Sequence, residues 1–240
     1  MTKKYYAYND FFGKELEICH QLLPNDDVIY KDLITPLAQY VRKMTKNGNN
    51  QINILFVGRT GSGKSNDAIQ FCRALDPKFS LRESYIYSAM DFVKKLKIIR
   101  SGGSVSKVSL FDEGSVSLNS MNSQKRGDVA LTICFDTLRS FGLCNCLCIP
   151  NERHLNKRIG ENHLDFMFKC PNISPVKGYS RKGFVDVYTH VYRDWADPYW
   201  DPIGTTIVEK LPPRIWEEYQ TVKKEHQFML IDSLDEGALS

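Results

Sequence analysis

The chain has 240 residues, of which 42% are hydrophobic and 12% aromatic, and its formal net charge is +4. This composition is typical of one globular domain with short extensions, and it excludes a disordered chain. The small positive excess permits contact with a polyanion but does not require it.

Neither a membrane span nor an export signal is expected. The central stretch without charge, residues 140–151, is shorter than the roughly 18 apolar residues that a spanning helix needs. The N-terminus lacks the apolar segment of a secretory signal. We therefore expect a cytoplasmic protein without membrane insertion. Its alternating Cys144, Cys146 and Cys148 are expected to be buried as small apolar residues in a strand, with a metal cluster as the alternative.

Residues 1–50 are predicted to form a helical N-terminal extension. Apolar residues between Leu16 and Leu23 recur at helical spacing, and so does a second set between Leu33 and Met44. A polar turn over residues 46–51 ends this segment.

Strands and helices are predicted to alternate over residues 51–170. The predicted strands are 52–57, 85–87, 105–111, 143–149 and 164–168, and the predicted helices are 66–75, 89–100 and one that begins near Asp128. This alternation predicts an α/β fold with a parallel sheet and helices on both faces. Lys94, Lys95, Lys97 and Arg100 are expected to lie on an exposed helix face.

Residues 171–240 are predicted to form a C-terminal extension. Two extended runs within 171–194 predict a β-hairpin at one edge of the sheet. A helix is expected from Arg214 to about Phe228.

Residues 58–65 read GRTGSGKS and satisfy the phosphate-loop pattern G-x-x-x-x-G-K-[ST] between a predicted strand and a predicted helix. Glycines let successive backbone N–H groups point at one anion, and the helix N-terminus adds its dipole. We expect Lys64 to reach the β and γ phosphates and the Ser65 hydroxyl to bind Mg²⁺. The predicted nucleotide-binding residues are Gly58, Arg59, Thr60, Gly61, Ser62, Gly63, Lys64, Ser65 and Asn66.

Two acids follow the predicted strand that ends at Phe111. Asp112 is predicted to hold Mg²⁺ together with Ser65, and Glu113 to act as the general base toward an attacking water. The expected cofactors are therefore ATP and Mg²⁺. Strand 143–149 is expected between the phosphate-loop strand and the acidic strand, with Asn151 at its tip. Asn151 is either a sensor that hydrogen-bonds water or phosphate, or a simple turn residue.

Together these segments resemble the FtsK/HerA superfamily of additional-strand P-loop ATPases, and within it the small viral and plasmid genome-packaging and Zot-like ATPases. The resemblance rests on GRTGSGKS (58–65), FDEGS (111–115) and residues 137–155, and more weakly on residues 211–224. It implies a homo-oligomeric ring, usually a hexamer, that moves double-stranded DNA. It also implies that Arg139 enters the neighbouring subunit's site to stabilise the γ-phosphate. The sequence departs from the family in having Asn151 where a glutamine is usual, and in lacking the N-terminal barrel of HerA proteins.

Several functions remain open at this point. The chain is predicted to be a ring motor that translocates double-stranded DNA, as in viral genome packaging, which would place it in the host cytoplasm with a portal or virion assembly protein as a further partner. The alternatives are a Zot-like ATPase for virion assembly or extrusion, a small-molecule kinase with lid arginines Arg153 and Arg158, and a module that only binds nucleotide. Residues 115–127, with Lys125 and Arg126, and residues 100–107 are candidate DNA contacts or plain connectors.

Overall fold

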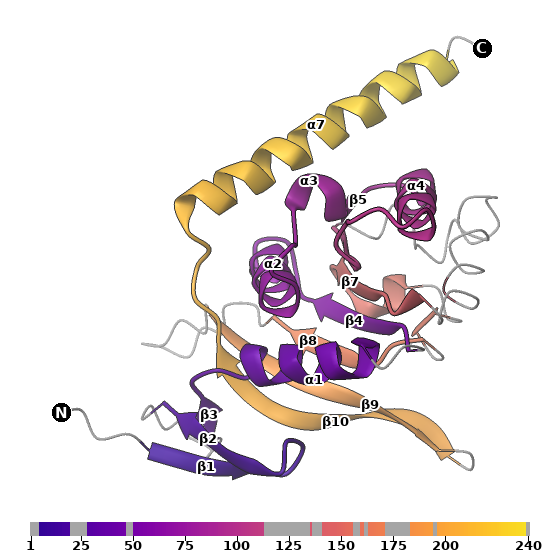
Figure 1. The fold of residues 1–240 in the computed structure, drawn as a ribbon. Helices are drawn as coiled ribbons and strands as arrows, with labels where there is room; N and C mark the ends of the chain where they lie inside the picture. The colour runs from indigo at the N-terminus through magenta and orange to yellow at the C-terminus, as the bar shows by residue number, and fades with distance from the viewer. Residues whose placement is uncertain are drawn as a thin grey trace.

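The computed structural model describes residues 5–19, 28–46, 50–112, 135, 141–155, 159–160, 163–170, 183–193 and 196–238. The strands of these segments form one mixed sheet (Figure 1). In spatial order they are β1 (Tyr5–Asn9), β2 (Lys14–Ile18), β3 (Ile29–Tyr30), β10 (Ala196–Ile207), β9 (Phe184–Arg193), β8 (Phe166–Lys169), β4 (Ile52–Val57), β7 (Cys144–Ile149), β6 (Val108–Phe111) and β5 (Tyr85–Ile86). The described helices are α1 (Ile34–Lys46), α2 (Lys64–Leu75), α3 (Leu81–Ser84), α4 (Ala89–Arg100), the 3-10 turn η3 (Glu152–His154) and α7 (Pro213–Ala238).

The part of the sheet from β8 to β5 is parallel. β4 pairs with β8 on one side and with β7 on the other, and β6 pairs with both β7 and β5. β7 therefore lies between the strand that enters the glycine-rich loop and the strand that ends before Asp112, as predicted. This is an α/β fold of the phosphate-loop NTPase type, and it confirms the predicted fold class.

Alternation along the central strands divides the core into two layers, because successive side chains of a strand point to opposite faces. Ile54 and Phe56 of β4 pack in one cluster with Leu37 of α1 and with residues of α2. Leu55, which lies between them in the strand, packs on the other face with Phe92 of α4. Helices thus cover both faces of the parallel half of the sheet.

The cysteines of β7 lie on the α2 side of the sheet. Cys144, Cys146 and Cys148 are each at most 2% exposed, so their predicted burial is confirmed. Burial raises the pKa of the Cys146 and Cys148 thiols well above their usual range, which keeps both thiols protonated. Among the residues that the structure describes, no three His, Cys, Asp or Glu side chains form a group that could hold a metal ion.

The predicted helical extension over residues 1–50 is wrong in its first part. Residues 5–9 and 14–18 form the antiparallel pair β1 and β2, and α1 is the helix among the described residues of this segment. Leu16 and Ile18 are two residues apart in β2, so both side chains point to the same face and pack against the core. The backbone of β2 at the same time pairs with β1. Leu22 and Leu23, which contributed to the helical spacing, lie outside the described residues.

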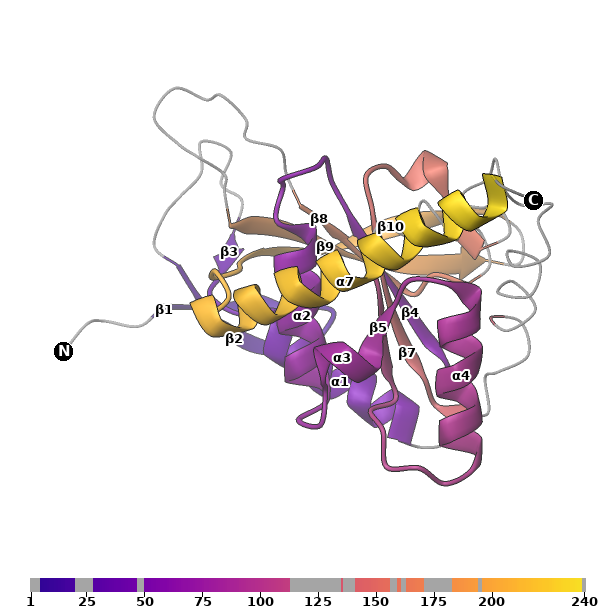
Figure 2. The same cartoon turned by 90° about the horizontal axis from the view of Figure 1, so that it is seen from above.

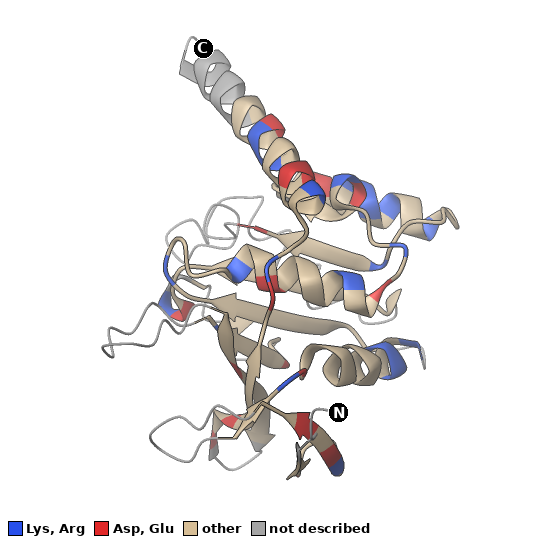
Figure 3. Cartoon of the chain, turned by 90° about the vertical axis from the view of Figure 1, so that its left-hand side faces the viewer, with Lys and Arg blue, Asp and Glu red and all other residues tan. Residues whose placement is uncertain are grey.

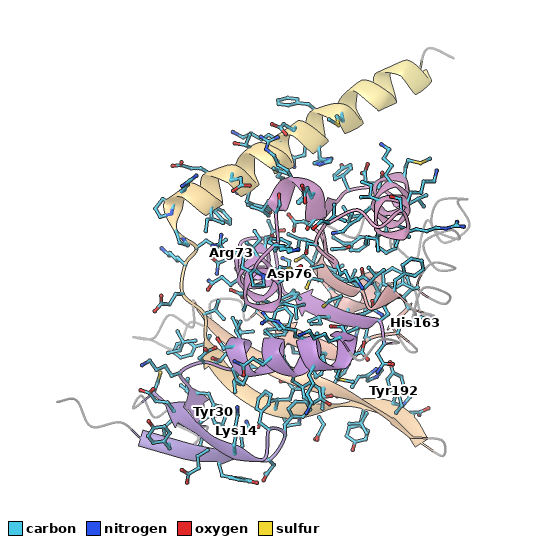
Figure 4. The ribbon with its side chains drawn as sticks, in the orientation of Figure 1. Lys14, Tyr30, Arg73, Asp76, His163 and Tyr192 are labelled. Atoms are coloured by element: carbon cyan, nitrogen blue, oxygen red, sulfur yellow. The ribbon has the colours of Figure 1, made fainter. Side chains whose placement is uncertain are left out.

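The second run of the predicted β-hairpin, residues 185–192, is part of β9 as expected, but β9 pairs with β10, and residues 171–182, which contain the first run, lie outside the described residues. β9 and β10 are antiparallel neighbours, and β10 is no edge strand because β3 pairs with its outer side. Figure 4 shows Tyr30 of β3 near one end of this hairpin and Tyr192 of β9 near its other end. Pro198 and Pro202 interrupt the strand pattern of the sequence, yet they accompany register shifts in β10, where a missing ladder donor is tolerated.

The C-terminal helix α7 is longer than the predicted helix over residues 214–228. Its first half packs onto the body, where Tyr219 and Val222 are each 2% exposed and join the α2 cluster. Figures 1 and 2 show α7 crossing over α2 and α3 on the same side of the sheet, with its C-terminal part extending beyond them. Acidic and basic residues are interleaved along the part of the helix that is coloured in Figure 3. No described helix of the protein combines the length and apolar character needed to cross a bilayer.

The basic residues of α4 do not share one exposed face as expected. Lys94, Lys97 and Arg100 are exposed, but Lys95 is 4% exposed. The ammonium group of Lys95 donates to the carbonyl oxygen of Val108, and burial lowers its pKa from 10.5 to about 8. A lysine can occupy this position because its aliphatic stem packs in the core while its head finds an acceptor.

Candidate functional site

The glycine-rich loop joins the end of β4 to the start of α2. Gly61 and Gly63 have φ angles of 79° and 102°, which residues with a side chain rarely adopt, so the loop conformation depends on glycine at both positions. The Nζ of Lys64 donates across the loop to the carbonyl oxygen of Arg59 at 2.9 Å. The predicted residues 58–66 are thus gathered around the N-terminus of a twelve-residue helix, where free N–H groups and the helix dipole attract an anion.

Asp112 meets the loop from the neighbouring part of the sheet. It follows β6 and is 4% exposed, and the Oγ of Ser65 donates to its Oδ1 at 2.8 Å. A hydroxyl and a carboxylate side by side are hard oxygen ligands of the kind that Mg²⁺ prefers beside a phosphate. The structure therefore brings together the two residues predicted to bind the metal, and their chemistry fits Mg²⁺.

Two residues of α7 also contact Asp112, and sequence reasoning missed both. The hydroxyl of Tyr219 donates to Asp112 Oδ2, and the Nζ of Lys223 lies 3.4 Å from the same oxygen. Burial, followed by the negative charge of Asp112, raises the pKa of Tyr219, so its hydroxyl remains a donor. Their spacing of four residues in a predicted helix indicates a shared face, but it does not indicate what that face contacts.

Asn66 fastens the chain that leads into α7. Its Oδ1 accepts a hydrogen bond from the backbone N–H of Leu211 at 2.8 Å, and its Nδ2 donates to the carbonyl oxygen of Glu209 at 3.0 Å. The loop and the start of α7 enclose a pocket of about 640 Å³, within the usual range for small-molecule sites. Residues from both segments line it, so the site is larger than the loop alone.

Asp67 places a second buried carboxyl next to the loop. It accepts hydrogen bonds from Asn66 Nδ2 at 3.0 Å and from the Cys170 thiol at 3.1 Å. Burial raises the pKa of Asp67 from 3.8 to about 6, although both hydrogen bonds oppose the shift. The Cys170 thiol stays protonated because burial and the nearby Asp67 raise its own pKa. The motif gives no signal for this acid, which lies just past its last residue.

The three predicted catalytic residues have different outcomes. Glu113 and Arg139 lie outside the described residues, so their roles stay predictions. Asn151 follows β7 as predicted, and its side chain is exposed and accepts a hydrogen bond from the backbone N–H of Arg153 at 3.0 Å. Here Asn151 caps the turn η3, and its role as a sensor stays a prediction.

Comparisons with known proteins add similarity in structure only. No protein-family model matches the sequence, and no curated protein matches it either. The chain is similar to the genome packaging NTPase B204 from Sulfolobus turreted icosahedral virus 2 in complex with ATP-gammaS, with 15% identity and a TM-score of 0.39 over 57% of this chain and 92% of that one. It is also similar to the N-terminal domain of zonular occludens toxin from Neisseria meningitidis, with 13% identity and a TM-score of 0.38 over 70% and 98% of the two chains. A third similar structure is the KaiC-like protein PH0186 from Pyrococcus horikoshii OT3, with 14% identity and a TM-score of 0.35 over 66% and 89%. Similarity at this level carries no argument about function, so the site is assigned from the geometry of this chain.

Proposed function

We propose that the chain is a magnesium-dependent ATPase. The proposal rests on the contact between the phosphate loop and the residue that follows β6. The hydroxyl of Ser65 donates to the carboxylate of the buried Asp112 at 2.8 Å. Loop N–H groups and Lys64 bind and orient the triphosphate, since the loop surrounds a helix N-terminus. Ser65 and Asp112 hold Mg²⁺, which neutralises charge on the β and γ phosphates when it is bound. Glu113, the next residue along the chain, takes the proton of the attacking water.

The more specific proposal is a homo-oligomeric ring that couples ATP hydrolysis to movement of double-stranded DNA, as in viral genome packaging. It is supported by the sequence resemblance of residues 58–65, 111–115 and 137–155 to FtsK/HerA ATPases, and by the insertion of β7 between β4 and β6. In such a ring, Arg139 of one subunit completes the site of the next. The alternative is a Zot-like virion assembly ATPase, which would use the same ATP-hydrolysing site to move a protein substrate.

Nucleotide binding and hydrolysis test the general proposal. Calorimetric titration with the non-hydrolysable analogue AMPPCP and Mg²⁺ should show binding to the wild-type protein and no binding to Lys64→Ala, because the loop then lacks its cation. Lys97→Ala is the matched control, since Lys97 is an exposed lysine of α4. Absence of binding to the wild-type protein, or normal binding to Lys64→Ala, would refute the assignment.

Duplex DNA tests the specific proposal. Phosphate release from ATP should increase when duplex DNA is added, and the particle mass in solution should correspond to a ring of several chains. A ring whose rate of ATP hydrolysis does not change when duplex DNA is added would favour the Zot-like alternative. Hydrolysis by a protein that stays monomeric under all these conditions would contradict a ring motor.

A further inference from the structure

The helix α7 runs along the phosphate loop from one side of the site to the other. At its start, Asn66 binds the backbone of Glu209 and Leu211, just before the helix begins. Two turns further on, Tyr219 and Lys223 reach Asp112 on the far side of the loop. Figures 1 and 2 show α7 crossing over α2, in agreement with these contacts.

One face of α7 is turned toward the loop. Trp216, Tyr219, Gln220 and Lys223 are spaced i, i+3, i+4 and i+7, which places them on the same side of a helix. All four line the pocket of about 640 Å³, whose opposite wall consists of residues 61–67. A molecule bound at the loop therefore lies against this face of the helix.

The two ends of this face differ in chemistry. Lys223 is a cation beside the predicted metal site, 3.4 Å from Asp112 Oδ2. Trp216 lies seven residues earlier, about 10 Å along the helix axis, with 41% of its surface exposed. The pocket lining also includes the apolar residues Val208, Leu211 and Pro213, together with the basic Lys210.

A nucleoside triphosphate also has two chemically different ends, a charged phosphate tail and an aromatic base. Its terminal phosphate belongs next to Ser65 and Asp112, and hence next to Lys223, while its base lies at the end away from the metal. An exposed aromatic ring on the wall of a pocket is suited to stack on a base, whereas a lysine is suited to a phosphate.

We propose that this face of α7 is part of the nucleotide site, with Trp216 stacking on the base and Lys223 binding the terminal phosphate. The inference rests on the proposed ATPase function and extends it to residues outside the phosphate-loop motif. It also makes nucleotide binding dependent on the position of α7.

Two ligands test the roles proposed for the two ends of this face separately. AMPPCP carries both base and phosphates, whereas inorganic tripolyphosphate carries only phosphates. Trp216→Ala should weaken binding of AMPPCP about tenfold or more, as loss of a stacked base does, and leave binding of tripolyphosphate unchanged. Trp216→Phe should restore most of the affinity for AMPPCP, because it keeps an aromatic ring. Lys223→Met should weaken both ligands. Phe228→Ala is the control, since Phe228 is 63% exposed on the same helix and is absent from the pocket lining.

Fluorescence gives a second readout of the base contact. The chain has three tryptophans, so replacing Trp195 and Trp200 by phenylalanine leaves Trp216 as the single emitter. AMPPCP should change the emission of this protein, and tripolyphosphate should change it much less.

The outcomes distinguish this inference from the proposed function. If Lys64→Ala abolishes AMPPCP binding while Trp216→Ala binds it normally, the phosphate site stands and the role of Trp216 is refuted. Equal losses of both ligands in Trp216→Ala would show that the ring only supports the helix, which also refutes it. If the wild-type protein binds neither ligand, the proposed function itself fails.

Discussion

Replacing Asp67 by asparagine measures the cost of a buried carboxyl beside the phosphate loop. Asp67 is 4% exposed, and burial raises its pKa from 3.8 to about 6. Each pKa unit corresponds to about 1.4 kcal/mol, so ionising Asp67 costs the folded protein about 3 kcal/mol more than it costs the unfolded chain. The protonated carboxyl thus contributes stability that the carboxylate does not.

The raised pKa of Asp67 determines how the free energy of unfolding depends on pH. Because the folded-state pKa lies above the unfolded value, this contribution is fully present below pH 3.8 and is lost as the pH rises through about 6. Asparagine does not titrate. The free energy of unfolding of Asp67→Asn, relative to wild type, should therefore increase by about 2 to 3 kcal/mol between pH 4 and pH 8.

Guanidinium chloride unfolding at intervals across that range measures the difference. The comparison between two proteins at each pH removes the contribution of all other titrating groups. Asp201→Asn, at an exposed aspartate, controls for the loss of a carboxylate as such. A difference between Asp67→Asn and wild type that stays constant across the pH range would show that burial does not perturb Asp67, and the reasoning would be refuted.

Three further predictions concern catalysis, assembly and the core. Glu113→Gln should bind AMPPCP as wild type does but release no phosphate from ATP, and normal turnover would remove Glu113 as the base. Arg139→Ala should stop hydrolysis in the assembled ring, and mixing it with Glu113→Gln should restore some activity because mixed interfaces contain intact sites. No rescue on mixing would contradict an arginine that acts between subunits. Phe56→Ala should lower the free energy of unfolding by about 3 to 5 kcal/mol, since the fully buried ring stacks on Phe168 at 4.6 Å. A decrease in the free energy of unfolding below about 1 kcal/mol, measured by chemical denaturation, would show that neighbouring side chains fill the space left by the Phe56 ring.

Much of the site could be predicted because its signals are local. The motif at residues 58–65 contains Gly61 and Gly63, whose φ angles are left-handed, and the residues that start α2, so strand, loop and helix are encoded within residues 52–75. The place of β7 between β4 and β6 also agrees with the predicted order. The role of Glu113 and that of Arg139 stay predictions.

The amino-acid sequence by itself determined the phosphate loop, the acid that follows β6 and the burial of alternating cysteines in β7, because each depends on the spacing of neighbouring residues. Only the tertiary structure decided what lies opposite the loop. Tyr219 and Lys223 reach Asp112 across more than a hundred residues of chain, and no periodicity of the helix specifies that partner. The same holds for β1 to β3, where the gain from pairing with an existing sheet outweighs a weak local preference for helix.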